Sequence, residues 1–96
     1  MTKEQFDRCI IAMESGQYKW GRDSLYNKKT DCYCPVGLCS LVLCGSWLYK
    51  YNPADPIALF TSIQTEDELI DYNDTIAKGW PDVIAYFNQH KQKIVD

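Results

Sequence analysis

The sequence has little positive charge, a single histidine and no apolar run long enough to cross a bilayer. Ten basic residues against thirteen acidic ones give a net charge of −3 at pH 7, which matches nucleic acid and anionic membrane surfaces poorly. The most apolar run, residues 36–49, is about 14 residues long, whereas a membrane-spanning helix needs about 20. We therefore expect no membrane association and no direct binding of nucleic acid.

An apolar signal segment is also missing from residues 1–6. The chain has five cysteines, and without a signal segment these favour free thiols in a reducing compartment. No glycine-rich phosphate loop, serine elbow or dinucleotide fingerprint occurs in the sequence. The expected location is the cytoplasm, and no cofactor is expected.

The composition is that of an ordinary globular protein. Hydrophobic residues make up 46% and charged residues 24% of the chain, close to globular averages. Three Trp, seven Tyr and three Phe supply large side chains for one core. We expect residues 1–96 to form a single domain.

Amphipathic helices are predicted at both ends of the chain. Thr2 and Gln5 form a capping box before an apolar stripe, and Gly16 is a suitable stop. Trp80 and Pro81 open a final helix. The stripes consist of Phe6, Cys9, Ile10 and Met13 in the first helix and Val83, Phe87, His90 and Ile94 in the last.

A buried central helix is predicted over about residues 35–50. Pro35 suits a first helical position, and the residues that follow it are apolar nearly all round. The helix can end at Gly45 or continue toward Tyr51, before proline-containing turns at residues 52–56.

A short acidic helix and a small hairpin complete the predicted fold. Thr65 and Glu68 form a second capping box, and Asn73-Asp74 interrupts the helix that it opens. For Asn73-Asp74, local capping is favoured over ligand binding. Residues 24–34 predict a hairpin around a polar five-residue loop. The fold class is therefore α+β and mainly helical, with three to four helices around the central one.

Several short motifs occur in an order that resembles a family of uncharacterised small proteins of phages and actinobacteria. They are Tyr18-Lys19-Trp20, the helix start Cys34-Pro35-Val36-Gly37-Leu38, the pair Asn73-Asp74, and Asp82-Val83-Ile84 followed by Phe87. The sequence departs from that pattern at Leu38, where Ala is more usual, and at Lys78-Gly79-Trp80, where an Arg-Thr opening is common. The resemblance implies a compact helical fold and a phage or mobile-element origin, and it brings no activity with it.

Cys34 is the one candidate for a nucleophile. As the residue before Pro35 it caps a helix N-terminus, where a thiol pKa can be lowered. His90 is the only available histidine, and Asp74 or Asn73 can orient it. The alternative is that Cys34 packs as a small apolar residue. The spacing of Cys32, Cys34, Cys39 and Cys44 is atypical of zinc sites, so no metal is predicted.

Two surfaces are candidates for binding a partner. Between Asp55 and Asp82, seven carboxylates face a single lysine; such a segment can dock a basic partner or form a solvated helix face. An aromatic group between residues 18 and 51, beside Lys19 and Arg22, can contact a protein, stack a nucleotide or edge the core. The candidate contact residues are Trp20, Arg22, Tyr26, Glu66, Asp67, Asp71, Asn73 and Asp74.

The sequence favours a small acidic, non-enzymatic interaction protein that binds and modulates a host protein. Two alternatives stay open. One is a small-molecule or nucleotide binder that uses the aromatic and basic residues. The other is a thiol enzyme dependent on Cys34. A homodimer is compatible with either surface.

Overall fold

The side chains at the start of the first helix determine where it begins. The structure, a computed structural model, describes residues 1–49 and 59–96. Helix α1 (Lys3–Glu14) starts after Thr2, whose hydroxyl accepts a hydrogen bond from the Gln5 amide. The Gln5 side chain in turn accepts one from the Thr2 amide. Two amides that a helix end leaves unpaired are thereby satisfied. The predicted first helix is confirmed.

Helix α2 (Pro35–Cys44) is shorter than the longest version that the sequence allows. Pro35 occupies the predicted first position, and Gly45 follows the last turn with a φ of 78°. This left-handed conformation suits glycine and ends the helix. The predicted end at Gly45 is therefore correct, and the range 35–50 is too long. Residues 50–56, where the sequence predicts a longer helix or turns, lie outside the described residues.

Helix α3 (Ile63–Thr75) starts earlier and runs further than the sequence predicts. The Ser62 hydroxyl accepts a hydrogen bond from the Thr65 amide (3.2 Å), so Ser62 caps the helix and the predicted cap at Thr65 is wrong. The predicted interruption at Asn73-Asp74 is also wrong. Both side chains bond to a distant segment of the chain, so they do not compete with the local helical backbone.

The last predicted helix begins at the expected residue and breaks near its end. Helix α4 (Trp80–Gln89) has Pro81 in its first turn, where the missing amide hydrogen leaves no bond unmade. His90 has a φ of −106° and a ψ of 20°, and it separates α4 from the short α5 (Lys91–Ile94). Phe87 is completely buried, which confirms the inward face of the predicted stripe.

The predicted hairpin is part of a three-stranded sheet. Strands β2 (Tyr26–Asn27) and β3 (Cys32–Tyr33) pair antiparallel, with Tyr26 opposite Tyr33. Strand β1 (Lys19–Trp20) pairs parallel with the other edge of β3, so the strand order is β1-β3-β2. The sequence predicts the hairpin but not β1, because two residues carry no alternation pattern.

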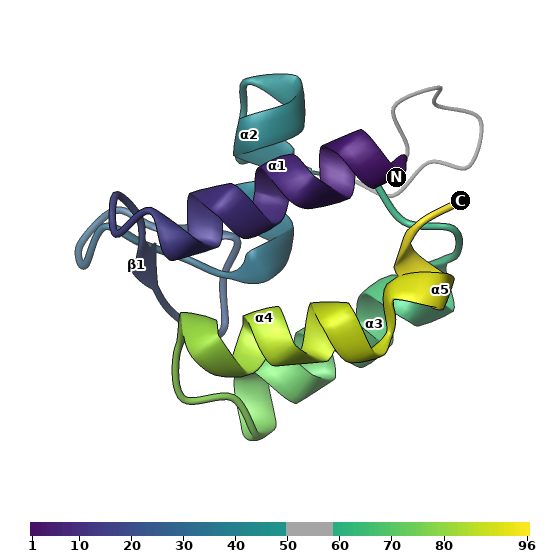
Figure 1. The fold of residues 1–96 in the computed structure, drawn as a ribbon. Helices are drawn as coiled ribbons and strands as arrows, with labels where there is room; N and C mark the ends of the chain where they lie inside the picture. The colour runs from purple at the N-terminus through teal and green to yellow at the C-terminus, as the bar shows by residue number, and fades with distance from the viewer. Residues whose placement is uncertain (50–58) are drawn as a thin grey trace.

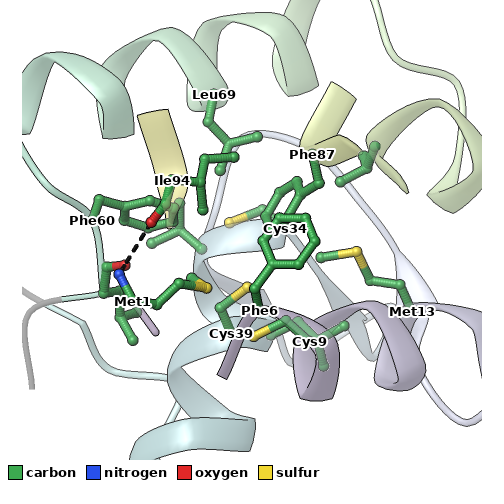
Figure 2. Packing of buried hydrophobic residues seen from close by; sticks show 14 of the residues in the cluster. Met1, Phe6, Cys9, Met13, Cys34, Cys39, Phe60, Leu69, Phe87 and Ile94 are labelled. Carbon is green, nitrogen blue, oxygen red and sulfur yellow. Dashed lines mark hydrogen bonds between the residues drawn. The ribbon is translucent and has the colours of Figure 1, made fainter. Parts of the chain in front are cut away.

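Helix α1 lies across from α3 and α4, and α2 contacts both α1 and α3 (Figure 1). The sheet lies at the end of the molecule where α4 begins. Phe6 of α1 meets Phe87 of α4 with ring centroids 5.8 Å apart, beside the buried Cys9 and Cys39 (Figure 2). The fold is thus α+β and mainly helical, as predicted. No helix within residues 1–49 and 59–96 combines the length and apolar character that crossing a membrane requires.

The start of α2 touches the sheet region where there is no room for a side chain. A Cβ on Gly37 would overlap the carbonyl group of Leu25. The same carbonyl oxygen accepts a hydrogen bond from the Cys34 amide (3.2 Å). Gly37 is therefore required for the close approach of two backbones. This contact fixes Leu25, and with it residues 23–25, beside the beginning of α2.

Candidate functional site

The candidate residues of the sequence fall mainly into two neighbouring regions. The first, which we call the seam, is the contact of residues 20–25 with residues 70–77, that is, with the end of α3 and the turn after it. The second, which we call the acidic face, is the exposed side of α3 around Asp67 and Asp71.

Asn73 lies at the centre of the seam and is completely buried. Its Oδ1 atom accepts a hydrogen bond from Nε1 of Trp20 (2.7 Å), and its Nδ2 atom donates one to the carbonyl oxygen of Gly21 (3.0 Å). Both ends of the amide are thus satisfied inside the protein. The structure brings the two candidates Trp20 and Asn73 together and directs their polar groups at each other.

Arg22 and Trp80 extend the seam through further internal contacts. The guanidinium carbon of Arg22 lies 5.3 Å from the centroid of the Trp20 ring, and its Nη2 atom donates to the Ala77 carbonyl oxygen. Nε1 of Trp80 donates to the Tyr18 carbonyl oxygen (2.7 Å). These groups hold the fold together, which leaves less of the predicted aromatic and basic surface for a ligand.

Tyr26 lies outside the seam, among half-buried rings on the sheet. Its ring centroid is 4.6 Å from that of Tyr33 and 5.5 Å from that of Trp47. Its hydroxyl donates a hydrogen bond to the Asp31 carboxylate (2.8 Å), and this bond raises the pKa of Tyr26. These rings pack on one another at the edge of the core, one of the arrangements that the sequence left open.

A cavity of about 210 Å³ lies beside the seam, between the sheet region, the start of α2 and α3. Cys34, Asn73 and Asp74, which are far apart in the sequence, meet at this cavity. The complete lining consists of Asp23, Ser24, Leu25, Cys34, Pro35, Ile70, Asn73 and Asp74.

Two aspartates line the cavity, and the backbone amide of Asp23 helps to hold the carboxylate of Asp74. Asp23 has a φ of 70°, a left-handed conformation that Asp adopts more readily than most residues. Its amide donates a hydrogen bond to Oδ1 of Asp74 (3.1 Å), and Nδ2 of Asn73 donates to the same oxygen (3.3 Å). Because the lining contains neither Lys nor Arg, the cavity is negatively charged.

Cys34 caps α2 with its thiol. The Sγ atom accepts a hydrogen bond from the Gly37 amide (3.4 Å), and the residue is 6% exposed. Burial raises the pKa of the Cys34 thiol, and the charge of Asp74 raises it further. Of the two alternatives that the sequence left open, a thiol with a lowered pKa does not fit, because desolvation outweighs the hydrogen bonds at the helix N-terminus.

His90 lies away from this cavity and does not line it. It follows α4 at the end that adjoins α5, whereas β1 lies near the beginning of α4 (Figure 1). Its ring centroid is 4.2 Å from that of Tyr86, which stacks on Tyr72 at 4.5 Å. The structure thus groups Cys34 with Asp74 but leaves the histidine of the hypothetical triad in an aromatic stack.

The cysteines considered as metal ligands are dispersed. Cys39 is completely buried beside Cys9, and the hydrogen bond between these thiols raises the pKa of Cys39. Cys32 is half-buried and Cys44 is exposed. In the described part of the chain, no three potential ligands among His, Cys, Asp and Glu gather around a common point.

The acidic face forms a shallow hollow lined by Asp67, Glu68, Ile70, Asp71 and Asp74. Asp67, Glu68 and Asp71 are exposed. Glu68 lies 3.9 Å from Nζ of Lys93, and within residues 1–49 and 59–96 this is the one ion pair on the face. The hollow shares Ile70 and Asp74 with the cavity, so the two form a continuous surface.

Glu66 differs from its acidic neighbours because it points inward with Leu69 and Asn73. It is 9% exposed, and its Oε2 atom is buried without a hydrogen-bond partner. Burial raises the pKa of the Glu66 carboxyl, and the charge of Asp67 adds to the effect. Positions 66, 69 and 73 follow the i, i+3, i+7 spacing that places residues on one side of a helix. This spacing in the sequence identifies the inward face of α3.

Most of the cavity wall is formed by residues that the sequence does not single out. Asp23, Ser24, Leu25, Pro35 and Ile70 complete the lining. No local pattern identifies Asp23 or Ser24, since they reach α3 only through contacts between distant segments. For Ile70 the available signal was its position, next to the inward side of the acidic helix.

Comparison of the chain with protein-family models, curated proteins and solved structures gave no match.

Proposed function

We propose that this chain is a non-enzymatic binding protein whose acidic face docks a basic segment of a partner protein. The observation that carries the proposal is the exposure of Asp67 and Asp71 beside Asp74, around a hollow that Ile70 also lines. Complementary charge steers a basic partner to such a surface, and an apolar contact at its centre adds affinity.

The charge distribution supports a protein partner over a nucleotide or nucleic acid. Phosphates would meet the carboxylates of the acidic face and of the cavity beside it. The guanidinium group of Arg22, which belongs to the seam, is engaged with Ala77 and Trp20. Lysine and arginine side chains of a protein segment fit this surface instead.

The resemblance to small proteins of phages and actinobacteria extends the proposal. On that basis the partner is a host protein in the host cytoplasm, and docking modulates its activity. The acidic face carries the docking, and the half-buried rings around Tyr26 do not line its hollow.

The test begins with selection from a displayed library of random 12-residue peptides on the wild-type protein. We expect lysine and arginine to be enriched over the unselected library. The best peptide is then synthesised and titrated against the double variant D67N/D71N. Loss of two exposed charges should weaken binding about fivefold, and raising the ionic strength should reduce the wild-type affinity.

The matched control is E4Q/E14Q, which removes two exposed carboxylates from α1 and changes the net charge by the same amount. Its affinity should stay within a factor of two of the wild type. Equal losses in the two double variants, or a selection without basic enrichment, would refute the proposal.

A further inference from the structure

The cavity beside the seam is smaller than the pockets that bind drug-sized ligands. Its volume is about 210 Å³, whereas pockets for drug-sized ligands span about 300–1,000 Å³. It adjoins the acidic face through Ile70 and Asp74. A peptide lying along α3 can therefore insert one side chain without leaving the surface.

The lining combines apolar walls with negative charge. Leu25, Pro35 and Ile70 are apolar, and Asp23 and Asp74 bring two carboxylates to the same cavity. Asp23 is exposed and Asp74 is half-buried, so a cation held between them keeps part of its hydration. That reduces the desolvation cost which makes fully buried ion pairs weak.

An anionic guest would find no free donors at the start of α2. The Val36 and Gly37 amides are both directed at Sγ of Cys34, the Leu38 amide donates to the Cys34 carbonyl oxygen, and Pro35 has no amide hydrogen. The two carboxylates would also repel it.

We infer that this cavity receives one lysine side chain of the docked segment. The alkyl stem lies against Leu25, Pro35 and Ile70, and the ammonium group binds Asp23 and Asp74 at the mouth. The inference rests on the proposed function, because the lysine belongs to the basic segment that the acidic face docks.

The geometry of Asp74 favours an ammonium over a guanidinium group. Oδ1 of Asp74 already accepts hydrogen bonds from the Asp23 amide and from Asn73. The parallel two-oxygen pairing that arginine prefers is therefore obstructed, whereas a compact ammonium group needs single lone pairs from separate carboxylates.

The experiment uses the basic peptide selected on the wild-type protein, with each lysine replaced in turn by norleucine, which keeps the stem and lacks the charge. We expect the replacement at one lysine of the peptide to lower the affinity by about tenfold, and more than the replacement at any other lysine. In D23N, and in S24F, where a ring covers the mouth of the cavity, the same replacement should cost no more than about twofold. D31N is the matched control, because Asp31 is also an exposed aspartate with positive φ (57°), and it should retain the tenfold effect.

Chemical shifts of the backbone amides locate the contact independently. N-acetyl-lysine N-methylamide should shift the signals of Asp23, Ser24 and Asp74, and the norleucine analogue should not. Suppose that D67N/D71N weakens peptide binding, but that replacing each lysine by norleucine costs the same affinity in D23N and S24F as in the wild type. The cavity inference is then wrong, and the proposed function survives. If the peptide is indifferent to D67N/D71N while the lysine derivative still shifts these signals, the docking proposal fails and the cavity retains its preference for an alkylammonium group. Tighter binding of free n-butylammonium than of the peptide would overturn the assignment to a peptide side chain.

Discussion

The contact of α1 with α4 and the seam between residues 20–25 and α3 are held by different interactions. Between α1 and α4, Phe6 and Phe87 are buried in an apolar cluster. In the seam, the main contacts are the hydrogen bond that the Trp20 indole donates to Asn73 and the one that Asn73 donates to the Gly21 carbonyl oxygen. The free energy of the apolar contact depends on the area and volume that are buried. The free energy of the hydrogen bonds depends on the positions of individual atoms.

Because of this difference, one region mainly provides stability and the other mainly determines the shape of the site. Apolar packing accepts other residues of similar volume, whereas Asn73 is satisfied by one arrangement of residues 20–23. The cavity is bordered by the seam and not by the Phe6–Phe87 contact. The polar contacts therefore determine its geometry, and the apolar core supplies most of the free energy of folding.

The largest effect is expected from F87A, which removes a completely buried ring. It should lower the free energy of unfolding by about 3–5 kcal/mol, measured by urea denaturation. F87L, which keeps much of the volume, should lose less than half of that amount. I11A is the control, because Ile11 is 67% exposed, and it should change stability by less than about 0.5 kcal/mol.

An intermediate effect is expected from N73A, which leaves the Trp20 indole N–H and the Gly21 carbonyl without their partner. Water reaches these half-buried groups in part, so we expect a loss of about 2 kcal/mol in urea denaturation. N73D keeps the acceptor for Trp20 but places a buried carboxylate oxygen against the Gly21 carbonyl oxygen and Oδ1 of Asp74, so at pH 7 it should lose at least as much stability as N73A.

N88A changes an exposed asparagine of α4 and serves as the control for N73A. The NMR chemical shift of the Trp20 indole N–H proton should change in N73A and stay unchanged in N88A. A loss in N73A as large as that in F87A would contradict the distinction between the two regions.

The smallest effect is expected from E66Q and depends on pH. Burial raises the folded-state pKa of Glu66 above its ordinary value of 4.5, so ionised Glu66 is less favourable in the folded protein than in the unfolded chain. Wild-type stability should therefore fall, relative to E66Q, as pH rises from below 4.5 through the folded-state pKa.

We expect E66Q to be more stable than the wild type by about 1 kcal/mol at pH 7, and the advantage to shrink at pH 4. Urea denaturation at the two pH values measures this difference. E14Q changes an exposed glutamate and should show no such trend. An advantage of E66Q that is equal at pH 4 and pH 7 would contradict the burial of a charged carboxylate.

Local signals in the sequence predicted the helices better than their ends. The capping box at Thr2 is complete within four residues and was identified correctly. At α3 two hydroxyl groups are candidates for the cap. The Thr65 hydroxyl oxygen lies 3.1 Å from that of Ser62, and Ser62 is the residue that caps the helix. The choice depends on where the preceding chain arrives, which no local pattern records.

The site shows the same limit. Cys34, Asn73 and Asp74 were identified from their own motifs, since a capping cysteine and an Asn-Asp pair stand out in sequence. Their convergence on a cavity with Asp23 depends on hydrogen bonds between segments about fifty positions apart. The parallel strand β1 escaped prediction because its two residues carry no alternation pattern, so that only its pairing with β3 defines it.

The contact between Gly37 and the Leu25 carbonyl bears on the entropy of binding. Because one backbone lies directly on another there, the backbone of Leu25, a residue that lines the cavity, cannot move closer to α2. A guest then gives up its own rotamer freedom, while the wall has little freedom to lose. We expect such a wall to select by shape and to reject a branched side chain that a softer pocket would accommodate.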